Sequence, residues 1–374
     1  MANAAGSTHS RISAAAYQFP TGMTNIMNTW LQFLAGQGAR FDDSGSVASF
    51  GDSPLPPAPA EGFIAPLTDL GLIAASGADA ADFLHNQLTN DVENLGSAEA
   101  RLAGYCSPKG RLLATFLTWR TADQILLQLP RAIQPAIQKR LQMFVLRSKV
   151  KLEDASERLV ALGIGGSAAT SALAHWFPLL PSAPYATASS DAGTLIRVAD
   201  AFGAPRYQWI ATEAQAQAAW AALSAALPAC GTQVWRLADI DAGIPQVTAP
   251  TQEQFVPQMV NYEAVGGVNF RKGCYPGQEV VARSQYLGKL KRRMLPAHVD
   301  APQAQAGMEV FSDADPDQPC GMVVNAETLP QGGFACLVEL KTAAAQAGGI
   351  HLGSAGGPLL QLRALPYALP DAQA

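Results

Sequence analysis

The sequence predicts an α+β fold that ends in a small β-barrel. Segments with helical periodicity and short apolar strands are mixed along the chain without regular alternation. After residue 295 the helical signals fade, and short apolar runs are separated by Gly, Pro and Asp turns. A chain of 374 residues is also too long for one small core. We therefore expect three domains, over residues 27–153, 154–290 and 291–374.

The first domain is expected to begin near residue 27, after an N-terminal extension over residues 1–26. That extension is small and polar, and it lacks the apolar core of a secretory signal. A helix follows, and the Pro-rich segment 51–62 is predicted to isolate it from the body. The side chains expected on the apolar face of this helix are Trp30, Phe33 and Leu34.

The remaining elements follow from their periodicity. Ser76 and Asp79 predict a capping box at the start of a helix. In the first domain we expect a strand-like run over 63–76, a helix over 77–91, a hairpin of 111–119 with 124–130, a helix over 131–145 and a strand over 149–154. In the second we expect strands over 158–166 and 194–200 and helices over 167–177 and 213–227. The barrel strands are expected over 307–311, 320–327, 335–340 and 358–365.

Composition excludes several classes of function. With 48% hydrophobic and 15% charged residues, the chain is typical of a globular protein, and no apolar run approaches a membrane span. A net charge of −5 excludes a generally basic nucleic-acid binder. The histidines and cysteines lack metal-site spacing, so no metal site is predicted. Five scattered cysteines favour a reducing compartment, and we therefore expect a cytoplasmic protein, which we also expect to be a monomer. The cysteines are Cys106, Cys230, Cys274, Cys320 and Cys336.

One cysteine stands in a distinctive setting, the stretch "NFRKGCYPGQEVVAR" over residues 269–283. Pro276 suits the first turn of a helix, which would place Cys274 just before a helix N-terminus. The helix dipole and the cations Arg271 and Lys272 would then favour the thiolate, so we interpret Cys274 as a reactive thiol. The alternative is a small buried hydrophobic residue, which is our interpretation for the other four cysteines.

The segment "RKGCYPGQE" resembles the K-G-C-[FY]-x-G-Q-E signature of the YgfZ family of folate-binding iron–sulfur proteins, a branch of the glycine-cleavage T-protein superfamily. The segments "FVPQMVNYEAVGGVNF", "FLHNQLTND" and "DAGIP" are also similar to that family. The resemblance covers residues 27–365. It maps the family's functional motif onto Lys272, Gly273, Cys274, Tyr275, Gly277, Gln278 and Glu279.

The resemblance implies a three-domain T-protein-like fold with a central opening that holds tetrahydrofolate. It implies a role in assembling or repairing iron–sulfur clusters of client enzymes, including tRNA-modifying ones, with Cys274 and Lys272 as the functional residues. A single cysteine cannot hold a cluster by the four-thiolate scheme, so any contact with a cluster would be transient and shared. Whether Cys274 would ligate a cluster, form a disulfide or attack a folate adduct stays open.

Two aspartates are candidates for the folate contact. A carboxylate can accept both N–H groups of a pteridine edge. The superfamily uses a Glu-Ala-Gly segment, and the matching tripeptide here begins at Asp241. A turn-forming Asp before Gly is the alternative. Asp239 is the second candidate, because it would share the direction of Asp241 if the segment were a strand.

The T-protein enzymes carry acidic residues near the folate nitrogens, and the matching segment 107–120 has none. Leu113 and Ala114 stand in their place, which disfavours the alternative function, a folate-dependent aminomethyl or one-carbon transferase. Lys109 and Arg111 in this segment are candidates for the folate glutamate tail, although a solvated turn explains them equally. Arg271 is a further folate-binding candidate.

A basic stretch follows the cysteine motif in this acidic chain. A solvated helix end is the ordinary interpretation. The alternative is a docking site for iron–sulfur client enzymes or assembly factors, while a tRNA-binding module would rest on these cations alone. The sequence shows no base-stacking aromatic pattern, so direct tRNA contact is not expected. The cations are Arg283, Lys289, Lys291, Arg292 and Arg293.

Overall fold

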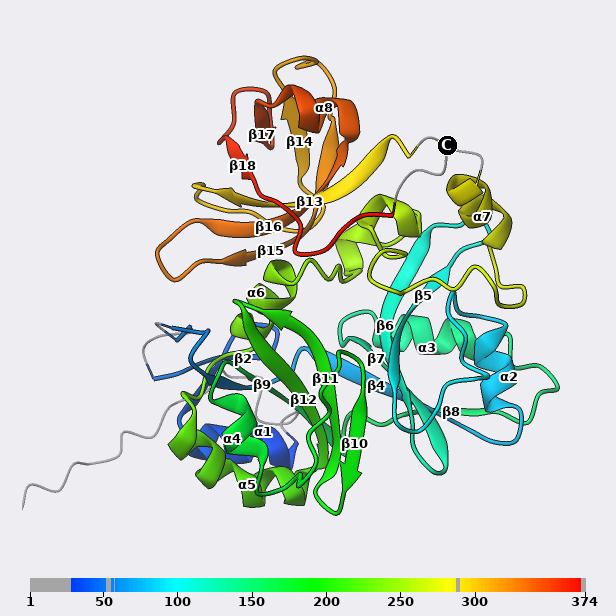
Figure 1. Ribbon diagram of the computed structural model, residues 1–374, viewed down its shortest axis with the longest axis vertical. Coiled ribbons are helices and arrows are strands. Elements are labelled where there is room, and N and C mark those ends of the chain that lie inside the picture. Colours follow the sequence, from blue (N-terminus) through cyan, green and yellow to red (C-terminus); the bar gives the residue numbers. More distant parts are fainter. Residues whose placement is uncertain (1–27, 52–54, 57, 287–289, 371–374) are drawn as a thin grey trace, which may run out of the picture.

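The computed structural model describes residues 28–51, 55–56, 58–286 and 290–370. The predicted extension over 1–26 and Lys289 lie outside these ranges. Figure 1 shows two sheets side by side and a third, barrel-like sheet above them. All pairings between named strands are antiparallel, which confirms the α+β class. None of the described helices is long and apolar enough to cross a membrane.

The first sheet has the strand order β5-β6-β7-β4-β8. The predicted hairpin is confirmed, since β6 pairs antiparallel with β7. The predicted capping box is wrong: Asp79 precedes α2 without capping it, and its carboxylate accepts from the backbone N–H of Lys149 at 2.7 Å. The elements are β4 (Leu70–Ser76), α2 (Ala80–His85), β5 (Ala100–Cys106), β6 (Leu112–Arg120), β7 (Gln124–Pro130), α3 (Gln134–Gln142) and β8 (Lys151–Asp154).

The second sheet has the order β10-β11-β12-β9-β3, with helices packed on one face. The first helix is not isolated as predicted, because Trp30 of α1 is buried edge-on against Trp220 of α5, with ring centroids 6.1 Å apart. The elements are α1 (Thr29–Gly36), β3 (Phe63–Pro66), β9 (Leu159–Gly165), α4 (Ala169–Leu173), β10 (Thr187–Ser190), β11 (Gly193–Ala201), β12 (Ala204–Thr212) and α5 (Glu213–Ala226). Strands β1 (Ala39–Phe41) and β2 (Val47–Phe50) form a separate two-stranded sheet.

The predicted strand over 63–76 is divided between the two sheets. Strand β3 pairs with β9, and after a turn β4 pairs with β7. Helix α6 (Gln233–Asp241) lies beside this crossing, and its Arg236 binds Asp69 at 2.8 Å and Glu327 at 2.7 Å. Because Asp69 lies between β3 and β4 and Glu327 belongs to β15 of the upper sheet, one guanidinium links the three larger sheets.

The C-terminal sheet has the order β17-β14-β15-β16-β13-β18. A bridge between His351 and Leu359 brings its two edges together, so the sheet is a nearly closed barrel as predicted. Its first strand was missed, because its basic start at Arg292 was assigned to a helix end. The elements are β13 (Arg292–Val299), β14 (Glu309–Ser312), β15 (Gly321–Thr328), β16 (Phe334–Lys341), α8 (Thr342–Ala347), β17 (Ile350–Leu352) and β18 (Leu360–Leu362).

Candidate functional site: a central double cavity and an exposed cysteine loop

The two candidate aspartates do not lie on a strand. They belong to the last turn of helix α6, where successive residues are rotated by about 100°. Asp239 and Asp241 are therefore about 200° apart and point to different places, which corrects the assumption that they share a direction. They face two adjoining cavities, which share the lining residues Tyr185, Ala199 and Ile244.

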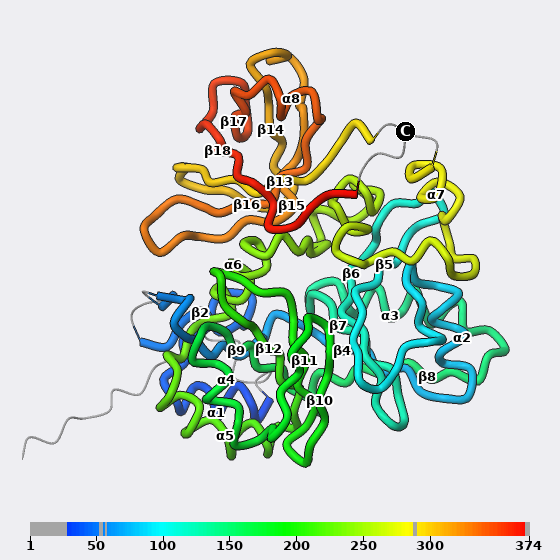
Figure 2. The backbone as a smooth tube through the Cα atoms, in the orientation of Figure 1, coloured from blue at the N-terminus to red at the C-terminus, as the bar shows by residue number. Residues whose placement is uncertain are grey.

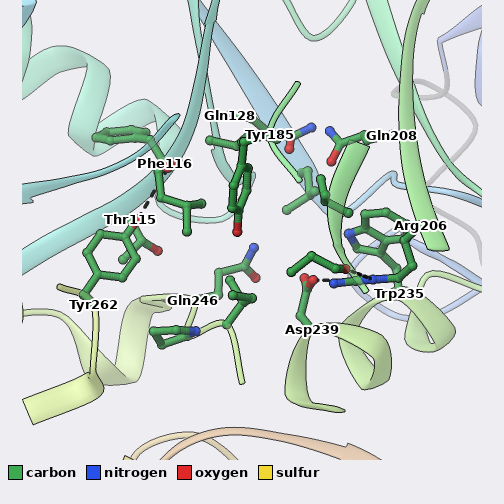
Figure 3. Close-up of a pocket in the computed structure, with 17 residues that line it drawn as sticks. Thr115, Phe116, Gln128, Tyr185, Arg206, Gln208, Trp235, Asp239, Gln246 and Tyr262 are labelled. Atoms are coloured by element: carbon green, nitrogen blue, oxygen red, sulfur yellow. Dashed lines mark hydrogen bonds and ion pairs between the residues drawn. The ribbon is translucent and has the colours of Figure 1, made fainter. Parts of the chain in front are cut away.

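Asp239 faces the smaller of these, here called the inner cavity, with a volume of about 70 Å³. Figure 3 shows its carboxylate turned to the guanidinium of Arg206 on β12, 2.9 Å away. The Arg206 side chain is 1% exposed and lies over the ring of Trp235, 4.7 Å from its centroid. Burial raises the pKa of Asp239, and the charge of Arg206 opposes that rise.

Two buried amides also line the inner cavity. Gln128 on β7 and Gln208 on β12 are 5% and 2% exposed, and their side-chain nitrogens have no hydrogen-bond partner among the described residues. An unpaired buried donor costs about 1–3 kcal/mol. A ligand with hydrogen-bond acceptors would remove that cost, so these amides fit a polar heterocycle better than an apolar one.

Asp241 faces the larger, outer cavity, whose volume of about 450 Å³ lies in the range of small-molecule sites. One carboxylate oxygen accepts from the backbone N–H of Phe202 at 2.5 Å, and the side chain is otherwise exposed. Tyr185 and Tyr367 are the aromatic side chains of its wall. The outer cavity thus combines an exposed carboxylate, which has one oxygen bound to a backbone N–H, with aromatic surfaces, and a flat ring with N–H donors requires this combination.

The cysteine of the motif is on the surface. Of the five cysteines, Cys274 is exposed and the other four are buried, as interpreted from the sequence. Burial raises the pKa of Cys106, Cys230 and Cys336 to about 12, so these thiols stay protonated at neutral pH. Pro276 does not lie in the first turn of the next helix as predicted, because helix α7 (Gln278–Tyr286) begins two residues after Pro276. Cys274 therefore lies four residues before the helix, in a loop.

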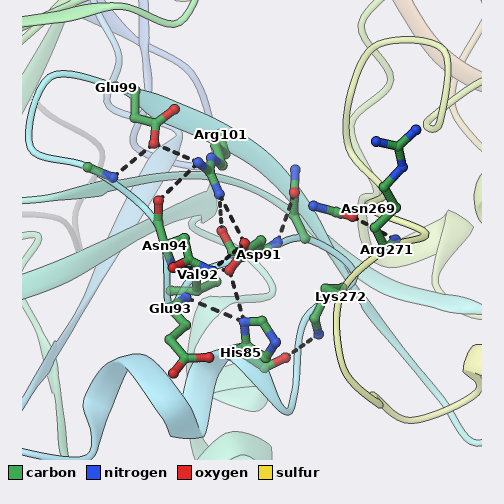
Figure 4. Close-up of polar contacts among 12 residues, drawn as sticks. His85, Asp91, Val92, Glu93, Asn94, Glu99, Arg101, Asn269, Arg271 and Lys272 are labelled. Atoms are coloured by element: carbon green, nitrogen blue, oxygen red, sulfur yellow. Dashed lines mark hydrogen bonds and ion pairs between the residues drawn. The ribbon is translucent and has the colours of Figure 1, made fainter.

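Lys272 anchors this loop to the end of helix α2. Its ammonium donates to the carbonyl of Leu88 at 2.8 Å. It also donates to the carbonyl of His85 (Figure 4). It also lies 4.9 Å from the ring centroid of Tyr275. Burial lowers the pKa of Lys272 to about 8, while Asp91 and Cys274 favour its charged form. A cation at the C-terminal carbonyls of a helix is favourable, so Lys272 positions the cysteine loop.

A pair missed from the sequence lies beside this anchor. His85 Nδ1 is 3.1 Å from Oδ1 of Asp91, which also accepts from the backbone N–H of Asn94 (Figure 4). Arg101 donates to the backbone carbonyl of Asp91 and lies 3.9 Å from its Oδ2. The backbone N–H and the side chain of Asn94 help lower the pKa of Asp91, although its partial burial opposes this. The two residues are six positions apart across a helix end, so helical spacing could not reveal the pair.

Two glycines allow the cysteine loop to approach the turn over residues 107–110. Gly277 has a φ of +78°, and a Cβ there would lie 2.4 Å from the carbonyl oxygen of Ser107. Gly110 has a φ of +70°, and its Cβ would lie 2.8 Å from Val280. Both positions therefore need glycine for conformation and for space. At Gly273 a Cβ would meet only His85, at 3.5 Å.

The other motif residues support the loop. Tyr275 is 6% exposed, Gln278 begins helix α7, and Glu279 is exposed on it. The predicted folate-tail cations do not line either central cavity: Lys109 and Arg271 are exposed, and Arg111 donates to the carbonyl of Gln254 at a separate surface. Their folate role stays a prediction without support from this geometry.

The predicted docking cations divide into two groups. Arg292 is paired with Glu339, and Arg293 is paired with Glu263, two glutamates that are nearly buried. These guanidiniums neutralise internal charges, so they are poor docking groups. Arg283 and Lys291 are exposed. Docking of a partner therefore stays a prediction that rests on these two. Among the described residues, no group of His, Cys, Asp and Glu is arranged to hold a metal ion.

No protein-family model matches the chain. It is 33% identical over 290 residues to the tRNA-modifying protein YgfZ of Edwardsiella ictaluri (strain 93-146), covering 75% of this chain and 86% of the relative. It is 31% identical over 331 residues to the protein of the same name from Klebsiella pneumoniae (strain 342), covering 86% and 99%.

The fold is similar to that of a solved enzyme, the glycine cleavage system aminomethyltransferase T from Bartonella henselae. The TM-score is 0.71 over 90% of this chain and 96% of the enzyme, at 16% sequence identity. At that identity the match shows the fold alone, and it confirms the predicted T-protein-like architecture. The relatives match over most of their own lengths, and the resemblance carried by the cysteine motif is confirmed: the chain belongs to the YgfZ family.

Proposed function

We propose that this protein is a cytoplasmic, tetrahydrofolate-binding accessory protein that supports the assembly or repair of iron–sulfur clusters in client enzymes. Its relatives are named as tRNA-modifying proteins, so the clients include tRNA-modifying enzymes. In this proposal the central double cavity holds the folate, and Cys274 acts on the client. Tetrahydrofolate supplies a flat heterocycle with N–H donors on one edge and acceptors on another.

The observation that carries the folate proposal is the pairing of complementary groups in the two cavities. Asp241 and Asp239 supply acceptors, while the unpaired amides of Gln128 and Gln208 supply donors. Tyr185 stands between them, because it lines both cavities. Asp241 has the roomier cavity and the freer carboxylate, so we assign it the pteridine N–H groups.

The folate contact is tested by replacing Asp241 with Ala. Loss of a hydrogen bond to a charged group should weaken tetrahydrofolate binding by about 1.5–3 kcal/mol. Anaerobic calorimetry measures this directly. Asp241→Asn is the matched control: it keeps an oxygen for the N–H of Phe202, so its loss of affinity reports the charge. Unchanged affinity in Asp241→Ala would remove this residue from the site and leave Asp239 as the candidate.

The transferase alternative lacks a carboxylate in the matching strand. The part of β6 that lines the inner cavity is Thr115, Phe116 and Leu117, and the neighbouring Leu113 and Ala114 are buried. We therefore predict no production of methylene-tetrahydrofolate from an aminomethyl-lipoyl carrier above a protein-free control. An assay with purified protein checks this, and turnover above that control would overturn our assignment.

Cys274 fits an accessory role because its loop is both exposed and firmly held. Lys272, Gly277 and the buried ring of Tyr275 fix the backbone on either side of the thiol. A partner can therefore reach a thiol whose position does not need to be ordered on binding. The exposed Arg283 on the adjoining helix α7 could receive an acidic partner there.

A further inference from the structure

The last described segment of the chain leaves the barrel and returns to the central cavity. After β18, residues 363–370, here called the strap, run between the barrel and the lower domains (Figure 2). The strap contains no helix or strand, and none of its side chains is fully buried. The backbone N–H of Arg363 donates to the carbonyl of Pro296 at 2.8 Å, which holds its first residue to β13.

Tyr367 attaches the middle of the strap to the rim of the outer cavity. Its hydroxyl donates to the carbonyl of Gly243 at 2.8 Å. A Cβ on Gly243 would lie only 2.7 Å from Tyr367 Cε1, so the ring packs directly on the backbone that follows Asp241. Burial raises the pKa of Tyr367 to about 12. Pro366 and Tyr367 together form one wall of the outer cavity.

This wall differs from the others in how it is held. Tyr185, Asp241 and Ile244 belong to segments packed in the main core or paired within the sheets. The strap is held at its start by the backbone bond of Arg363 to β13, and at its middle by the packed ring and the hydroxyl of Tyr367. Pro366 and Pro370 restrict the backbone, so the strap can move as a short stiff unit. Segments with few buried contacts open at low free-energy cost.

We propose that the strap is a lid over the outer cavity and that Tyr367 is its ligand-facing side chain. The strap swings away to admit the ligand and then closes the tyrosine ring over a flat heterocycle beside Asp241. The identity of the ligand rests on the proposed function, and the lid itself rests on the contacts of Tyr367.

The kinetic test uses stopped-flow binding of tetrahydrofolate. Tyr367→Ala and a chain ending at Arg363 leave every barrel strand intact, since β18 ends at Leu362. Removing a lid should speed both association and dissociation about tenfold, because binding that needs a conformational change is slow. Tyr367→Phe keeps the ring and loses the bond to Gly243, so it should speed association more than dissociation. Rates within twofold of the wild type in the first two variants would overturn the proposal.

A second measurement needs no ligand. Tetranitromethane should nitrate Tyr367 more slowly than Tyr286, which is 58% exposed and provides the internal control. Peptide mass spectrometry ranks the two sites, and tetrahydrofolate should slow nitration of Tyr367 further. Equal rates in the free protein would show that the strap is not docked, which overturns the lid. Failure of tetrahydrofolate to bind the wild type would instead overturn the proposed function, and the nitration ranking would still decide the lid.

Discussion

Replacing Cys274 with Ser is expected to abolish support of client enzymes while leaving the fold intact. The side chain is exposed and lies in a loop held by other residues, so its loss creates no cavity. In the proposed function, the sulfur of Cys274 is the one reactive group of this protein that acts on the client enzyme. Serine keeps the shape, but its hydroxyl is a far weaker nucleophile and iron ligand at neutral pH than a cysteine thiolate. The measurement is the extent of tRNA modification by a client in cells that lack their own copy of the protein.

The matched control is Cys230→Ala, which removes a buried thiol. It should lower stability by about 1 kcal/mol, as small core truncations do, and leave client support unchanged. Pulsed alkylation supplies an independent measure, because Cys274 should label in the native protein and the four buried cysteines only on unfolding. Full client support by Cys274→Ser would show that the loop acts without its thiol.

Asp239→Ala should destabilise the protein far more than Asp241→Ala, although the two residues are neighbours. Removing Asp239 leaves the guanidinium of Arg206, 1% exposed, without its partner. An unpaired buried charge of this kind costs about 3 kcal/mol or more. Asp241 accepts one hydrogen bond from a backbone N–H and is exposed, so its loss should cost about 1 kcal/mol.

Urea denaturation of the two variants measures both free energies of unfolding. The difference matters for the folate experiments, because a loss of affinity in Asp239→Ala would combine misfolding with the missing contact. Asp239→Asn keeps an oxygen near Arg206 and is the better probe of the inner cavity. Equal destabilisation by the two alanine variants would mean that the pair with Arg206 contributes little.

The sequence predicted the class of fold and the motif loop well, because both depend on local signals. Two apolar runs joined by a short polar turn predicted the hairpin of β6 and β7. Pro276 predicted a helix start just after Cys274, two residues before the position at which α7 begins. The sequence did not reveal in which direction individual side chains point. Asp239 and Asp241 would point in the same direction on a strand, but they lie on helix α6. Their carboxylates therefore face two different cavities.

Long-range partners were also beyond reach. The anchoring of Lys272 on α2 and the pairing of Arg292 and Arg293 inside the protein depend on contacts across folded elements. The strap was missed for the same reason, since Tyr367 lies more than a hundred residues from Gly243 in sequence. The prolines and exposed alanines around Tyr367 form no apolar pattern with the period of a helix or a strand.

The most direct test of the central claim is a crystal structure of the protein with tetrahydrofolate, prepared anaerobically. The account predicts the pteridine ring in the outer cavity, with its N–H edge at Asp241, its face near Tyr185 and Tyr367, and the strap closed. A pteridine bound elsewhere, or cavities that stay empty at a tetrahydrofolate concentration that saturates the protein in calorimetry, would contradict it.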